Sequence, residues 1–153
     1  MPRDLFAKGL ATRRAVLGAG YVKKSLAAAD AFTMPFQELV TECAWGKVWS
    51  RPGLPRKTRS LVNVAMLSAL NRPHELKLHL RGAVNNGCTR QEIQEVLLQV
   101  AIYAGFPAAL DGFRTAHEFF RELDAAAAPA RAKAAASNNN NKGRRGRRKA
   151  TRR

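Results

Sequence analysis

These 153 residues lack several features that would indicate a class of protein. The chain has two cysteines, Cys43 and Cys88, far apart and without a C-x-x-C pair. This excludes a disulfide framework and a dithiol redox motif, so we expect a reduced, cytoplasmic compartment. No apolar run approaches the roughly 18 residues of a membrane span. The apolar patch at residues 15–20 is cut short by two lysines, so no secretory signal is expected.

Acidic residues are absent from the end of the chain. Residues 1–124 contain 17 Lys and Arg and all 11 acidic residues, whereas residues 125–153 contain ten Lys and Arg and no acid. This tail also lacks Leu, Ile, Val and aromatic residues, so it cannot bury enough apolar surface to offset the entropy of ordering. We therefore predict a helical domain over residues 1–124 and a disordered basic tail over 125–153. The alanines at its start are expected to extend a helix by a turn or two.

The sequence also lacks the alternating pattern of β-strands, and helical periodicity takes its place. In residues 89–104, Thr89 and Glu92 form a T-x-x-E capping box, and Gly105 stands where a left-handed C-terminal cap belongs. Further helices are expected at residues 3–17, 35–49, 55–70, 73–85 and from Pro107 onward. About six helices joined by short loops predict an all-α fold, a compact bundle.

The apolar positions predict which helix faces are buried. The stretch 61–70 is apolar nearly all round, which is typical of a central, buried helix. Two other helices have a single apolar face. The residues expected on the inner sides are Phe36, Leu39, Val40, Cys43 and Ala44 in helix 35–49, and Leu110, Phe113, Ala116 or His117, and Phe120 in the last helix.

The helix at residues 73–85 carries a polar stripe that can support chemistry, formed by Arg72, Glu75, His79 and Asn86. Glu75 and His79 are four residues apart, so their side chains can meet on one face. His79 lies at the margin of the apolar face, where partial burial beside a carboxylate suits proton transfer near neutral pH. The alternative is a surface pair or a hydrogen-bonded core histidine without catalytic function. Gly82, one turn later, permits a ligand or a neighbouring backbone to approach closely.

Two arginines stand at the start of the helix that begins after Pro55. Arg56 and Arg59 are candidates for binding a carboxylate, because arginine forks and a positive helix end together favour anions; the alternative is a solvated helix start. Trp45 and Trp49 are four residues apart and are typical of core or interface positions. There is no H-E-x-x-H motif and no cluster of Cys, His and acidic residues, so we predict no metal site.

Several motifs together resemble one family. WGKVWSRPGL at 45–54, HLRG at 79–82, NNGCT at 85–89 and YAGFPA at 103–108 resemble the 4-carboxymuconolactone decarboxylases, and shorter matches occur at 57–61, 92–93 and 97–99. The similarity spans most of residues 1–124 and none of the tail. It implies an alkylhydroperoxidase-D-like bundle that forms a homo-oligomer, a trimer or hexamer. The thiol pair of the redox members of this superfamily is replaced by Arg72 and Glu75.

The resemblance implies a carboxy-lyase of protocatechuate catabolism, in the β-ketoadipate pathway, that converts 4-carboxymuconolactone to 3-oxoadipate enol-lactone and CO2. The substrate is its own electron sink, so no cofactor is needed. In this interpretation His79 and Glu75 are catalytic, and Arg56, Arg59 and Trp45 contact the substrate.

Two alternatives stay open. The first is a relative that acts on another lactone or a peroxide-linked substrate. The second is a protein that binds nucleic acid through the basic tail, which is not favoured because the tail has no aromatic residue for stacking.

Overall fold

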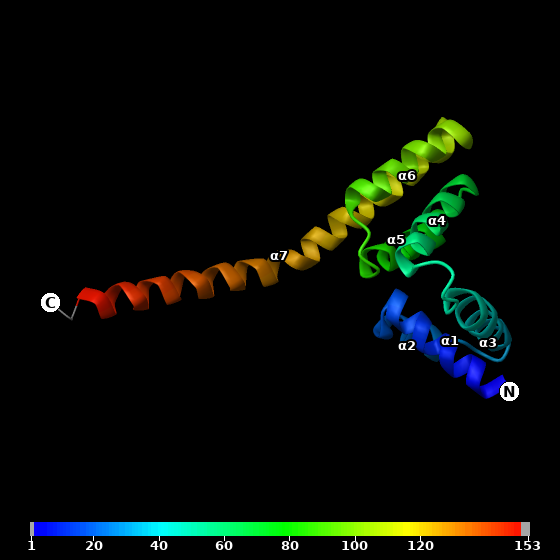
Figure 1. Ribbon diagram of the computed structural model, residues 1–153, viewed down its shortest axis with the longest axis horizontal. Coiled ribbons are helices and arrows are strands. Elements are labelled where there is room, and N and C mark those ends of the chain that lie inside the picture. The colour runs from blue at the N-terminus through cyan, green and yellow to red at the C-terminus, as the bar shows by residue number, and fades with distance from the viewer. Residues whose placement is uncertain (1, 151–153) are drawn as a thin grey trace. The chain divides into compact units, whose positions relative to one another are not determined.

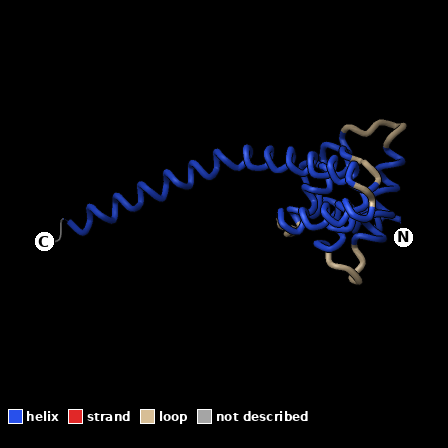
Figure 2. The backbone as a smooth tube through the Cα atoms, turned by 90° about the horizontal axis from the view of Figure 1, so that it is seen from above, coloured by secondary structure: helices blue, strands red, loops and turns tan. Residues whose placement is uncertain are grey.

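The computed structural model describes the backbone of residues 2–150 and the side chains of residues 4–129. Within this part the chain is helical throughout, with no strand, and short loops join the helices (Figures 1 and 2). In chain order the elements are α1 (Pro2–Leu17), α2 (Ala19–Ala27), α3 (Met34–Val40), the π-helix η1 (Thr41–Trp49), α4 (Arg56–Ala69), α5 (Pro73–Asn85), α6 (Arg90–Tyr103) and α7 (Phe106–Ala150). The predicted all-α fold is confirmed.

Helix α1 packs against η1 with almost no space between the two backbones. A Cβ atom added to Gly9 would lie 2.1 Å from the carbonyl oxygen of Thr41, and one added to Gly46 would lie 2.7 Å from that of Leu5. Both glycines are buried. Any side chain at either position would therefore force the helices apart. Val16 and Leu17 of α1, with Val22 of α2, then enclose Trp45 and Trp49 in one apolar cluster.

Helix boundaries follow the local signals closely. Thr89 Oγ1 accepts from the Glu92 amide at 3.1 Å and Glu92 Oε2 from the Thr89 amide at 2.8 Å, which confirms the capping box. Gly87 and Gly105 have φ angles of 82° and 98°, as left-handed helix ends require. Gly18, with a φ angle of 93°, ends α1 and separates it from α2. The short helix α2 was not predicted, since its nine residues carry no clear apolar stripe.

The buried faces differ from the prediction in three helices. In α4 the buried residues are Ser60, Val64 and Ser68, while Val62, Met66 and Leu70 are 44–68% exposed. This helix is therefore not buried on all sides within one chain; it packs on α5 and α6 by a single face. Apolar composition indicated burial, but composition cannot say whether the covering surface belongs to the same chain.

The other two differences concern register. Phe36 and Leu39 are 63% and 57% exposed, and Thr41, Trp45 and Trp49 are the buried side chains of this region. The predicted face is wrong because η1 turns the side of Thr41, Trp45 and Trp49 inward where it packs on α1, and the α3 residues Phe36 and Leu39 lie on another side. In α7 Leu110 is 52% exposed, while the buried positions nearby are Ala109 and Gly112. Gly112 is buried because α7 approaches Leu97 and Ser68 closely there.

The chain separates into two units, Met1–Ala116 and His117–Arg153. The bounds of helix α7 run through the alanine-rich stretch to Ala150; the disorder expected of the basic tail stays a prediction. Alanine has the highest intrinsic helix propensity, which favours helix in the alanine-rich stretch 125–136. The division into a domain over 1–124 and a tail over 125–153 stays a prediction. None of the helices in the described residues is both long enough and apolar enough to cross a membrane.

Candidate active site

His79 lies on α5 with its ring against the two tryptophans of η1. The ring centroid is 6.3 Å from that of Trp45 and 6.3 Å from that of Trp49, with interplanar angles of 5° and 24°. The tryptophans stack on each other at 4.9 Å. The two tryptophan rings thus fix the plane of the imidazole and restrict the rotation of the His79 side chain. The structure thus brings together His79 and Trp45, two of the predicted site residues.

The hydrogen-bond partner of His79 was not predicted from the sequence. The side-chain nitrogen Nδ2 of Asn63, on α4, lies 3.2 Å from Nδ1 of His79. Asn63 is the one amide in the apolar stretch 61–70, and a partly buried amide requires a partner. That requirement was the available signal. The partner itself could not be named, because the pairing of α4 with α5 is not encoded in local pattern.

Burial lowers the pKa of His79 below its ordinary value, and the Glu75 carboxylate opposes this by favouring the charged ring. Glu75 is exposed at the start of α5, one turn before His79. The predicted Glu75–His79 pair is therefore an electrostatic neighbour pair on one helix face. A lowered pKa favours the uncharged imidazole at neutral pH, and an uncharged imidazole suits a group that donates a hydrogen bond or moves a proton.

The π-helix η1 positions the two tryptophans. π-Helical turns are rare and occur often at functional sites. Here the turn stacks side chains four residues apart, so that Trp45 and Trp49 are only 4% and 7% exposed. The N-terminal end of η1 is held by Arg13, a buried arginine of α1 that donates to Thr41 Oγ1 at 3.0 Å and to Gln37 Oε1 at 2.9 Å. With so little exposed area, Trp45 acts chiefly as a wall behind His79. Its contact with a substrate stays a prediction.

The two predicted anion-binding arginines behave differently. Arg59 donates from Nε to the Leu54 carbonyl at 3.2 Å and from Nη2 to the Arg51 carbonyl at 3.3 Å. It thereby holds the connector before α4, and its other N–H groups are those available for an anion. Arg56 is exposed at the first turn of α4. Because Arg56 and Asn63 are seven residues apart, they share one face of α4.

A second amide joins α4 to α5 beyond His79. Asn86 donates from Nδ2 to Ser60 Oγ at 2.9 Å and more weakly to the Arg56 carbonyl at 3.5 Å. Ser60 is buried, so this hydrogen bond satisfies a hydroxyl that has no access to water. The polar stripe predicted on α5 is therefore real at His79 and Asn86, and it faces α4. Gly82 of the same helix lies against Val16 of α1, so the close approach there is by a neighbouring helix.

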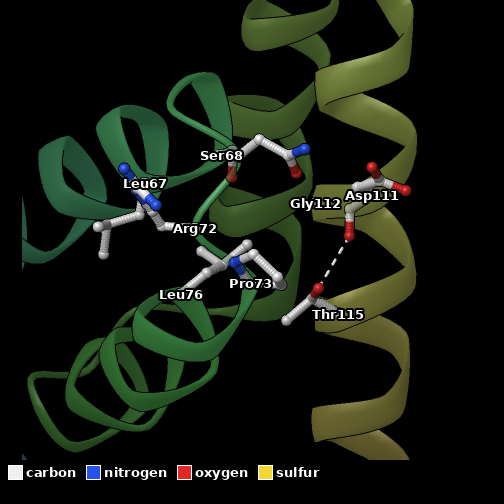
Figure 3. Close-up of a pocket in the computed structure, with 9 residues that line it drawn as sticks. Leu67, Ser68, Arg72, Pro73, Leu76, Asp111, Gly112 and Thr115 are labelled. Carbon is white, nitrogen blue, oxygen red and sulfur yellow. Dashed lines mark hydrogen bonds between the residues drawn. The ribbon is translucent and has the colours of Figure 1, made fainter.

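A recess near the start of α5 is too small to be a binding site. It is enclosed by Ser68, Arg72 and Leu76 on one side and by Asp111, Gly112 and Thr115 of α7 on the other (Figure 3). Its volume is about 140 Å³, and it is too narrow to admit a water molecule. Among the described residues, no group of three or more His, Cys, Asp and Glu side chains is placed to hold a metal ion.

The helical fold and the histidine held between α4 and η1 define a class of small all-α proteins with one partly buried histidine beside two tryptophans. Residues 35–118 match the model of the carboxymuconolactone decarboxylase family, and the chain belongs to this family. It is 46% identical to a 4-carboxymuconolactone decarboxylase of Acinetobacter baylyi over 121 residues, which cover 79% of this chain and 90% of the relative. It is also 49% identical to a nitrosuccinic acid decarboxylase of Metarhizium robertsii over 109 residues, 71% of this chain and 76% of the relative.

Proposed function

We propose that this protein is a carboxy-lyase that converts 4-carboxymuconolactone to 3-oxoadipate enol-lactone and CO2, a step of protocatechuate catabolism. The observation that carries the proposal is the partly buried His79, held by Trp45, Trp49 and Asn63 in a chain that aligns with nearly the whole length of a relative of that name. The longer coverage of this relative favours its substrate over that of the nitrosuccinic acid decarboxylase.

The chemistry needs three things from the protein. The departing carboxylate is attached to a ring carbon conjugated through the alkene to the lactone carbonyl, so the electron pair of the broken C–C bond moves onto the carbonyl oxygen. A proton added at the carbon next to that carbonyl then gives the enol-lactone. The protein must bind two carboxylates, stabilise the oxyanion and supply the proton.

The described residues offer a candidate for each requirement. Arg56 is proposed to bind a carboxylate at the positive end of α4, with the free N–H groups of Arg59 beside it. His79 is proposed to act at the reacting ring, where burial between aromatic walls strengthens its hydrogen bonds. Glu75, at the rim, is proposed to influence the protonation of His79 and to take part in proton transfer.

Turnover of 4-carboxymuconolactone by the purified chain tests this proposal, with a chelator present to separate metal-dependent activity. His79→Gln should lower kcat by about 100-fold or more, the range for a group that moves or shares a proton in the transition state. His74→Gln is the matched control, because His74 is exposed on the same helix. Glu75→Gln should cost about tenfold. Near-normal turnover by His79→Gln would remove His79 from the mechanism.

Nitrosuccinic acid is the second candidate substrate, favoured by the 49% identity to its decarboxylase. The two substrates share a pattern: one carboxylate leaves from a carbon next to an electron sink, a conjugated lactone or a nitro group, while a second carboxylate is retained. Comparison of kcat/KM for the two compounds discriminates between them. A ratio in favour of nitrosuccinic acid would replace the proposed substrate and leave the reaction class unchanged.

We also propose that the protein is a homo-oligomer, a trimer or hexamer, in the cytoplasm. The support is the large apolar surface left uncovered by one chain, which includes Phe32, Leu70, Ile102 and Phe106 at 68–90% exposure. Both cysteines are free thiols, as a reduced compartment requires. Light scattering on the purified protein should give the mass of three or six chains; a monomer would contradict the proposal.

The basic tail is proposed to be dispensable for catalysis. Truncation after Asp124 should leave kcat and KM unchanged. Retention of the full chain, but not of the truncated chain, on immobilised nucleic acid at low salt would instead assign the tail a binding function.

A further inference from the structure

We infer that Asn63 is a positioning residue that fixes His79 in the neutral tautomer with its proton on Nε2. The juxtaposition that carries this inference is the Asn63 Nδ2 atom 3.2 Å from the His79 Nδ1 atom, across the α4–α5 pair. An amide nitrogen only donates hydrogen bonds, so the nitrogen that it faces must accept. An accepting Nδ1 carries no hydrogen, and the proton of the neutral ring is therefore on Nε2.

The surroundings make this arrangement selective. The planes of Trp45 and Trp49 restrain the ring, so that exchanging its two nitrogens would require breaking the stack. Charging the ring would add a proton to Nδ1 and set two hydrogen-bond donors, that N–H group and the Asn63 amide, against each other. The charged side chain whose field reaches the ring is Glu75, on α5 itself; the contacts from α4 and η1 are with Asn63, Trp45 and Trp49, which are uncharged.

The consequence is a specific chemical role for the other ring nitrogen. A neutral imidazole with an Nε2–H group is a hydrogen-bond donor, and a donor matches the oxyanion that develops as CO2 leaves. The same nitrogen would be a base if the proton were on Nδ1. Asn63 thus selects between an electrophilic and a basic histidine, as a hydrogen bond to the far nitrogen does in other histidine sites.

The tautomer can be measured directly by nitrogen NMR of the imidazole rings in the whole protein. The chain has three histidines, and the His79→Gln spectrum identifies the signals of His79. At neutral pH the wild-type ring should give an unprotonated shift at Nδ1 and a protonated shift at Nε2. A protonated Nδ1 in the wild-type protein would overturn the inference, and this measurement needs no Asn63 variant to fold.

Asn63→Asp reverses the polarity of the contact with little change in shape. A carboxylate accepts only, so it should draw a proton onto Nδ1 and raise the pKa of His79 above its wild-type value. Asn86→Asp is the matched control, since Asn86 joins the same two helices without touching the ring. An unchanged tautomer and titration in Asn63→Asp, or equal changes in both variants, would overturn the inference.

The catalytic arm of the experiment rests on the proposed function. Wild-type kcat should stay level as pH rises above neutrality, because Nε2–H persists in the neutral ring. In Asn63→Asp, kcat should fall about 10- to 100-fold above the raised pKa of His79, with little change in KM. A wild-type kcat that instead falls with loss of the charged ring would contradict the donor role. Absence of all turnover by the wild type would refute the proposed substrate while leaving the tautomer result intact.

Discussion

The α1–η1 pair and the α4–α5 pair hold the two walls of the site by different means. The first is closed by glycines that bring backbone against backbone, and the second by the amides of Asn63 and Asn86. Glycine contacts tolerate no added volume but are indifferent to charge and pH. Amide contacts depend on which partner donates. The tryptophans are therefore held by shape, and His79 is held by shape on one side and by hydrogen-bond polarity on the other.

The largest expected effect is on the side held by shape. Gly9→Ala places a methyl group 2.1 Å from the Thr41 carbonyl oxygen, which neither helix can avoid without moving. We expect a loss of about 3 kcal/mol or more in the free energy of unfolding, measured by urea denaturation.

Gly20→Ala is the control for that experiment, because a Cβ atom at Gly20 meets nothing within 4 Å inside α2. It should instead stabilise the protein by about 0.5–1 kcal/mol through helix propensity. Equal destabilisation by both substitutions would show that the α1–η1 contact is not specially intolerant of volume.

A smaller loss is expected on the side held by polarity. Asn86→Ala removes the donor to Ser60 Oγ and leaves that buried hydroxyl without its partner, at a cost of about 1–3 kcal/mol. The double variant with Ser60→Ala should recover part of this cost, because the stranded hydroxyl is then gone. No recovery in the double-mutant cycle would mean that the two side chains do not interact energetically.

Local signals predicted what depends on local structure. The capping box at Thr89, the left-handed cap at Gly105 and the helix at 73–85 were all predicted, because caps and 3.6-residue periodicity are properties of a single segment. His79 was also predicted as a site residue, from its place at the margin of an apolar helix face. The role of Asn63 was not predicted, since it depends on which helices pair, and the π-helical turn was not predicted either.

The predicted burial of α4 failed for a related reason. Periodicity reports which face is apolar, and it cannot report what covers that face. Met66 and Leu70 remain exposed in a single chain although their sequence context resembles a core. Conversely, Arg59 was expected to be free for an anion, and it is partly committed to the carbonyls of its own connector.

The smallest expected effect is on the pH dependence of the free energy of unfolding, through the protonation of His79. Burial lowers the pKa of His79 in the folded chain, whereas the unfolded chain keeps the ordinary value near 6.5. Above that value both states hold a neutral ring, and the residue adds no pH dependence. As pH falls below about 6.5, the unfolded state binds the proton first, so stability decreases until the folded pKa is reached. The free energy of unfolding, measured between about pH 7.5 and pH 5, should fall less steeply in His79→Gln than in the wild type.

His74→Gln, at an exposed ring on the same helix, should retain the wild-type slope. Identical slopes for His79→Gln and the wild type would mean that the ring is as easily charged in the folded chain as in water, and that the clamp of Asn63, Trp45 and Trp49 does not control its protonation.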